Sequence, residues 1–188
     1  MSTATIEPAE HKEIRTSYSN DDQQFLTFNL AEEYYGVDIL KVQEIKGYTN
    51  VTKIPNTPDY LKGVLNLRGT IVPIVDLRMK FGMGVTEPTS FTVVVVVNVR
   101  NRVMGFLVDA VSDVLDLDKK DIQPPPELGN AVDITFVAGI GNSNDHLVTL
   151  LDIDRVLSDE EVATVAKVAP ESGKPASDSG PSQEESVD

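Results

Sequence analysis

The sequence predicts a mainly β protein made of two similar small units, each of about five strands. Segments of strand length, rich in β-branched residues, recur along the chain with turn residues between them, which is typical of barrels and sandwiches. The pattern of the first half also recurs in the second half. Helical patterns, by contrast, are few and short.

The expected strands follow one another through the middle of the chain. They include FLTFNL (25–30), YYGVDI (34–39), TIVPIVDL (70–77) and FTVVVVVNV (91–99). The valine run in the last of these predicts a buried central strand. A hairpin is expected in NVRNRVMGFLV (98–108), with Arg100 and Asn101 at its turn, and a second in LKGVLNLRGTIVPIVDL (61–77), with Arg68 and Gly69 at its turn.

Two segments carry helical signals. A short amphipathic pattern occurs in DILKVQEI (38–45), where Ile39, Val42 and Ile45 are spaced by three. A terminal helix is expected in SDEEVATVAKV (158–168), because Ser158 and Glu161 have the spacing of a capping box. Beyond it, the acidic and Pro/Gly/Ser-rich sequence predicts disorder.

An internal repeat relates the two halves of the chain. Residues 25–45 align with residues 94–114 at an offset of 69, and residues 61–81 align with residues 137–157 at an offset of 76. The aligned pairs include Asn29 with Asn98, Gly36 with Gly105, Val42 with Val111, Glu44 with Asp113, Ile45 with Val114, Gly63 with Gly139, Ile71 with Leu147 and Asp76 with Asp152. Recurring glycine, asparagine and aspartate positions favour a duplication, with 124–130 as a loop extension in the second copy.

The same alignment bears on whether residues 61–77 form an active site. Asp76 and Asp152 occupy equivalent positions, and each precedes the start of a short helical pattern. A helix N-cap accounts for a carboxylate at such a position. The segment is therefore expected to be a hairpin without a catalytic role.

Side chains suited to catalysis or metal binding are scarce. Cysteine is absent, and the two histidines are His11 in the polar N-terminal segment and His146 in an expected turn, where a solvated side chain is the favoured interpretation. We expect no catalytic, cofactor-binding or metal-binding residues. The alternative from another class is a small β-barrel enzyme that uses carboxylates such as Asp38, Asp76 or Asp109, which would require a deep polar pocket.

The composition limits the classes of partner and the cellular compartment that we expect for this protein. The formal net charge is −14 and much of it lies in the two ends of the chain, so nucleic-acid binding is not expected. The N-terminus lacks the apolar stretch of a signal peptide, and the longest apolar run is too short to span a bilayer. A cytoplasmic protein is expected.

Three blocks of the sequence resemble the CheW family of bacterial chemotaxis coupling proteins. They are IPNTPDYLKGVLNLRGTIVPIVDLR (54–78), EEYYGVDILKVQEIKGY (32–48) and GFLVDAVSDVL (105–115). The resemblance implies two SH3-like five-stranded β-barrels side by side. With this fold, the expected organisation is a flexible segment 1–22, a CheW-like domain 23–165 and a disordered acidic tail 166–188. Within the domain, we expect a first barrel at about 23–85 and a second at about 86–157, with or without exchange of strands, and then the terminal helix.

The resemblance also implies a function and partners. Such a protein is a non-catalytic adaptor that links the cytoplasmic tips of methyl-accepting chemoreceptors to the histidine kinase CheA. It would pair with the regulatory domain of CheA and bind the helical hairpin of the receptor tip in an apolar groove between the barrels. Contact with the membrane would be indirect, through receptor arrays. A detached regulatory domain of a CheA-type kinase, which would share the fold, is the alternative within this class.

Eight positions match family positions that contact the kinase or the receptor. They are Val42, Glu44, Lys62, Gly63, Arg68, Gly105, Val111 and Val114. For the three valines, a plain core role is an equal alternative. Glu44 and Arg68 suggest an ion pair on a partner-facing edge, where it would contribute more to specificity than to stability. The alternative is two unrelated solvated charges.

Overall fold

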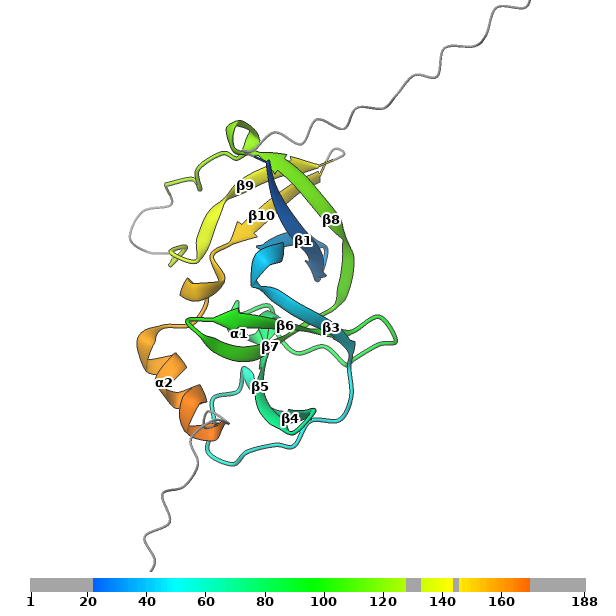
Figure 1. The fold of residues 1–188 in the computed structure, drawn as a ribbon, viewed down its shortest axis with the longest axis vertical. Helices are drawn as coiled ribbons and strands as arrows, with labels where there is room; N and C mark the ends of the chain where they lie inside the picture. The colour runs from blue at the N-terminus through cyan, green and yellow to red at the C-terminus, as the bar shows by residue number, and fades with distance from the viewer. Residues whose placement is uncertain (1–21, 128–132, 144–145, 170–188) are drawn as a thin grey trace, which may run out of the picture.

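The fold consists of two five-stranded β-sheets with a short helix at the side, as shown in the computed structural model (Figure 1). The structure describes residues 22–127, 133–143 and 146–169. These residues leave out 1–21 of the predicted N-terminal segment, most of the predicted acidic tail and part of the predicted loop extension. In the described part, no helix is long and apolar enough to cross a bilayer.

The A barrel is the sheet with the order β8-β1-β2-β10-β9. Its strands are β1 (Asp22–Leu30), β2 (Glu33–Asp38), β8 (Ala110–Asp118), β9 (Val137–Ser143) and β10 (His146–Leu151). All neighbours pair antiparallel except β2 and β10, which are parallel. A bridge between Gln123 and Ile140 joins the segment after β8 to β9 and so closes the barrel.

The B barrel is the sheet with the order β3-β6-β7-β5-β4. Its strands are β3 (Val42–Gly47), β4 (Leu61–Leu67), β5 (Thr70–Asp76), β6 (Val93–Val99) and β7 (Arg102–Val108). Here the parallel pair is β5 with β7, and a bridge between Thr52 and Val64 closes the barrel. Both hairpins predicted from the sequence, β4-β5 and β6-β7, are present.

The two barrels confirm the duplication. At the two offsets found in the sequence, β1, β2 and β3 align with β6, β7 and β8, while β4 and β5 align with β9 and β10. Replacing each strand by its counterpart converts one sheet order into the other. Even the closing bridges correspond, since Val64 aligns with Ile140. The N-caps predicted at Asp76 and Asp152 are both present.

Each barrel contains strands from both halves of the chain. β1 and β2 join the sheet of β8, β9 and β10, whereas β6 and β7 join β3, β4 and β5. Neither barrel is therefore one continuous segment, and the arrangement is the exchange of strands that the expected division at 23–85 and 86–157 left open. In each barrel the halves are joined by one parallel pair and one antiparallel pair.

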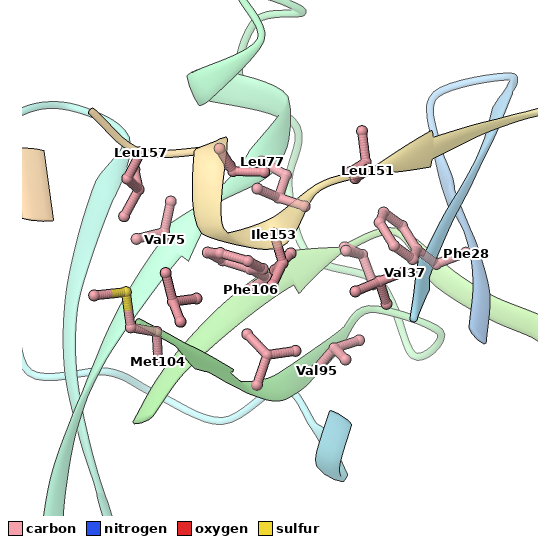
Figure 2. Packing of buried hydrophobic residues seen from close by; sticks show 14 of the residues in the cluster. Phe28, Val37, Val75, Leu77, Val95, Met104, Phe106, Leu151, Ile153 and Leu157 are labelled. Carbon is pink, nitrogen blue, oxygen red and sulfur yellow. The ribbon is translucent and has the colours of Figure 1, made fainter. Parts of the chain in front are cut away.

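Three clusters of apolar side chains hold this arrangement together. The interior of the A barrel contains Phe25, Leu117, Val148 and Leu150. The interior of the B barrel contains Leu67, Val72, Ile74, Val94, Val96 and Leu107. A larger shared core lies between the barrels and includes Phe28 and Val37 from one barrel and Val95 and Phe106 from the other (Figure 2).

The valine run illustrates how one strand serves two cores. In β6, Val94 and Val96 point into the B barrel, while Val95 and Val97 belong to the shared core. All four side chains are buried, which confirms the predicted central strand. A strand buried on both faces requires apolar residues at consecutive positions.

One helical prediction was wrong. DILKVQEI (38–45) forms the 3-10 turn η1 (Ile39–Lys41) and then enters β3, with Val42 opposite Val97 and Ile45 opposite Val95. β3 shows alternating exposure, which is the two-residue period of a strand. Pairing with β6, a contact distant in sequence, outweighs the local helical spacing.

The remaining helical elements lie beside the barrels. They are α1 (Leu77–Lys80), η2 (Lys119–Asp121), η3 (Ile153–Arg155) and α2 (Asp159–Val168). Helix α2 has the predicted capping box of Ser158 and Glu161. It ends at Val168, as predicted for the segment 158–168, and Val165 and Ala169 are buried.

Helix α2 is tied to the B barrel by a cluster of three polar side chains. Lys80 of α1 pairs with Glu161 of α2 at 2.6 Å, and the Lys80 ammonium lies 5.2 Å from the centre of the Tyr60 ring. Burial raises the pKa of the Tyr60 phenol to about 12, and the charge of Glu161 and its hydrogen bond with the phenol add to the increase.

We therefore expect a loss of stability at alkaline pH. Since the folded protein holds the Tyr60 proton more tightly than the unfolded chain, this contribution is complete below the ordinary pKa of 10.0 and is lost as pH rises toward about 12. The midpoint temperature of thermal unfolding, measured between pH 10 and pH 12, should fall more steeply for the native protein than for Tyr60→Phe. This variant keeps Lys80 and Glu161. Equal slopes would contradict the prediction.

Candidate partner-binding site

The two charges that the sequence suggested as partners form an ion pair on the B barrel. Glu44 lies on the edge strand β3, and Arg68 lies in the β4-β5 turn. Two hydrogen bonds join them, from Arg68 Nη2 to Glu44 Oε2 at 2.7 Å and from Nη1 to Oε1 at 3.3 Å. The Arg68 side chain is 82% exposed, so this bidentate pair presents a guanidinium on the surface.

The turn geometry explains how Arg68 reaches across the barrel end. Arg68 and Gly69 both have positive φ angles, 52° and 88°, as in the tight turns that join twisted antiparallel strands. The Asn66 side chain accepts a hydrogen bond from the Gly69 amide at 2.8 Å and fixes the turn. The bulge in β3 between Val42 and Glu44 shifts the register on the opposite edge.

Lys62 forms a second ion pair close to the start of α1. Its ammonium lies 3.2 Å from Asp76 Oδ2, and the Asp76 side chain is only 7% exposed. The other oxygen of Asp76 accepts the Met79 amide at 3.2 Å, as an N-cap does. Lys62 therefore balances a buried carboxylate, in addition to any contact with a partner.

The two glycines among the expected site residues have structural roles. Gly63 has φ +141°, and a Cβ placed there would lie 2.1 Å from the Thr52 carbonyl oxygen. A Cβ at Gly105 would lie 2.5 Å from Ile74 Cδ1 and 2.6 Å from Val94 Cγ1. Gly63 thus permits the closing bridge of the B barrel, and Gly105 permits close packing inside it.

The three valines divide between core and surface. Val42 and Val111 are partly buried and pack against the shared core from the edge strands of different barrels. Val114, on β8, is 42% exposed, and its counterpart Ile45 on β3 is 46% exposed. The alternative of a plain core role thus applies to Val42 and Val111, whereas Val114 presents apolar surface.

Exposed apolar residues that the sequence did not single out follow the same repeat. Ile71 on β5 is 40% exposed, and its counterpart Leu147 on β10 is 68% exposed. The alignment paired these residues, and also Ile45 with Val114, but hydrophobicity alone could not show that they face outward. Both aligned pairs therefore place apolar side chains on the surface at equivalent positions of the two barrels.

The carboxylates of the alternative enzyme hypothesis are engaged in local structure. Asp38 accepts the Leu40 amide at 2.9 Å and caps η1. Asp109 pairs with Arg78 at 3.0 Å and accepts the Ala31 amide at 2.7 Å. Asp76 and Asp109 line a common cavity, but its volume is about 20 Å³, which is space for a single water molecule.

Charges also connect the two barrels. Lys41 of η1, in the crossing from one barrel to the other, pairs at 2.7 Å with Asp154 of η3. Asp154 also accepts the Arg100 amide at 2.8 Å. Burial of the Asp154 carboxyl acts to raise its pKa, but the bonds from Lys41 and Arg100 outweigh it, so the pKa lies below its usual value. These bonds favour one arrangement of the barrels.

Known proteins with similar sequences settle the family. A CheW-like domain matches residues 24–161, which is most of the chain. The chain belongs to the CheW family. It is 50% identical to "Chemotaxis protein CheW" of Klebsiella aerogenes over 78% of this chain and 89% of that protein. It is 38% identical to the protein of the same name from Rhizobium meliloti, over 76% and 92% of the two chains.

A solved CheW structure has the same fold. It is the "scaffolding protein TtCheW from Thermoanaerobacter tengcongensis", with a TM-score of 0.67 and 35% identity over 71% of this chain and 91% of that chain. Membership of the CheW family and the two five-stranded sheets confirm the predicted pair of SH3-like barrels. The names of these relatives support an adaptor or scaffold role in chemotaxis.

Proposed function

We propose that this protein is a non-catalytic cytoplasmic adaptor that couples chemoreceptors to the histidine kinase CheA in signalling arrays. It would bind the regulatory domain of CheA and the helical hairpin at the receptor tip. The observation that carries the proposal is the exposed ion pair of Glu44 and Arg68, which lies on a chain of the CheW family. Since an exposed pair contributes little to stability, its position on the surface favours a role in recognition.

The partner surface would extend from this ion pair to the edge strands. Val42 and Val111 flank the shared core from β3 and β8, and Ile45 and Val114 add exposed apolar area on the same strands. A helical hairpin with an apolar face could pack against such residues. Lys62, Gly63 and Gly105 would act indirectly, because their contacts are within the B barrel.

Reversal of one charge should weaken partner binding without unfolding the protein. Arg68→Glu places two carboxylates together on the exposed edge, where we expect a stability loss of only about 0–1 kcal/mol. Co-sedimentation with receptor-containing membranes, with and without CheA, should fall at least about tenfold. The double variant Glu44→Arg/Arg68→Glu restores an ion pair with its charges exchanged. Recovery of binding would show that the pair itself is required, and no recovery would show that the arginine is required at position 68.

The control is Lys53→Glu, which reverses an exposed charge in the connection between β3 and β4 of the B barrel. If Arg68→Glu sedimented like the native protein, or unfolded, the proposed role of the ion pair would be wrong. If the native protein itself bound neither partner while remaining folded, the adaptor proposal would fail. A kinase assay in reconstituted arrays then measures coupling directly.

A further inference from the structure

The two barrel ends differ in one respect that the duplication makes visible. In the B barrel, the carboxylate of Glu44 is paired with the guanidinium of Arg68. In the sequence alignment of the two halves, Glu44 aligns with Asp113 and Arg68 aligns with Asn144. Asp113 lies in the A barrel. The A barrel thus retains the carboxylate, while the chain provides no arginine at the aligned position.

A cavity opens beside Asp113 at this end of the A barrel. Its volume is about 260 Å³, and its lining includes Thr27, Tyr34, Asp113, His146 and Val148. Thr27 and Val148 are buried, whereas Asp113 and His146 are exposed. The cavity therefore has a buried floor and a polar rim that is open to solvent.

Asp113 is held in place by its backbone, which leaves carboxylate capacity free. The Thr27 hydroxyl donates to the Asp113 carbonyl at 2.8 Å and accepts the Asp113 amide at 3.0 Å. One carboxylate oxygen, Oδ1, accepts the Val114 amide at 2.7 Å. Asp113 is exposed, so its carboxylate can be reached from the solvent side.

Two stacked rings supply a flat surface in the same cavity. The phenol of Tyr34 and the imidazole of His146 have their centres 4.8 Å apart and an angle of 25° between their planes. The faces of aromatic rings attract the planar guanidinium group of arginine, and a carboxylate binds its N–H groups. The cavity thus combines the two features that recognise an arginine side chain.

We propose that this cavity at the end of the A barrel binds an arginine side chain from a protein partner, which would supply the charge that Arg68 supplies in the B barrel. Its guanidinium would donate hydrogen bonds to Asp113 and stack on the Tyr34–His146 pair. A phosphate or carboxylate ligand would be repelled by Asp113. A lysine ammonium could reach the same carboxylate but lacks the planar group that the rings favour.

The source of the arginine, a signalling partner, rests on the proposed function. Binding of an arginine side chain can be tested without that partner. The probe is acetyl-Gly-Arg-Gly-amide, titrated into the isotopically labelled full chain and followed by NMR. We expect saturable shifts of the amides of residues 113–115 and 146–148. The lysine peptide should bind more weakly, and the norleucine peptide should leave these amides unchanged.

Two isosteric variants test whether the Asp113 carboxylate binds the arginine peptide. Asp113→Asn should weaken binding of the arginine peptide about tenfold, since a bond to a charged group is lost. Asp116→Asn removes a negative charge from the same strand but leaves the cavity intact, and it should bind like the native protein. The dispersion of the spectrum reports whether each variant is folded.

Several results would overturn the inference. They are an absence of shifts at these amides, equal binding by the Asp113→Asn and native proteins, or equal shifts from the norleucine peptide. Co-sedimentation with receptor membranes and CheA is then repeated with Asp113→Asn. Binding of the arginine peptide without any partner binding by the native chain would support the cavity and reject the adaptor proposal, so the two failures are distinguishable.

Discussion

Replacement of Phe106 by alanine should lower the free energy of unfolding by about 3–5 kcal/mol. Phe106 is only 2% exposed and lies in the shared core, beside side chains from both barrels (Figure 2). Its removal leaves a cavity at the contact between the barrels. Because this core contains residues of both sheets, we expect the two barrels to unfold in a single transition. Urea unfolding followed by circular dichroism and by tyrosine fluorescence measures both effects.

Phe91→Ala provides the matched control for this prediction. Phe91 is 72% exposed, so the same substitution there should change stability by less than about 0.5 kcal/mol. Two separate transitions, or a loss for Phe106→Ala no larger than for Phe91→Ala, would show that the barrels are stabilised independently. In that case the shared core would not be the main contact between them.

The second large effect is expected for Gly63→Ala, which should cost about 2–4 kcal/mol. The new Cβ would lie 2.1 Å from the Thr52 carbonyl oxygen, which is backbone and cannot rotate away. The positive φ of +141° adds strain for any residue other than glycine. The amide of Val64 donates to the same Thr52 oxygen at 2.8 Å, so relief of the clash would break the bridge that closes the B barrel.

Gly47→Ala is the corresponding control within the same sheet. A Cβ at Gly47 meets no atom within 4 Å, and we expect almost no change in stability. If Gly63→Ala unfolded at the same urea concentration as Gly47→Ala but failed to bind a partner, the role of Gly63 would be direct contact. A loss of stability accompanied by normal binding at low temperature would assign it to the fold.

The sequence suggested the ion pair of the candidate site, with two unrelated charges as the alternative. Glu44 and Arg68 lie in separate signature segments, and the structure brings their opposite charges together. The role of Gly63 could not be predicted, because its contact with Thr52 depends on closure of the barrel. Tyr34 and His146 were also missed, since the ring contact depends on the parallel pairing of β2 with β10.

The sequence by itself determined the mainly β class, the duplication, the hairpin turns and the N-caps. These features depend on residue type at short range, such as the positive φ of Arg68 and Gly69 or the carboxylates of Asp76 and Asp152. Only the tertiary structure decided that strands are exchanged between the halves and that 38–45 contains a strand. Both outcomes result from pairing between distant segments, which buries both faces of β6 and outweighs local preference.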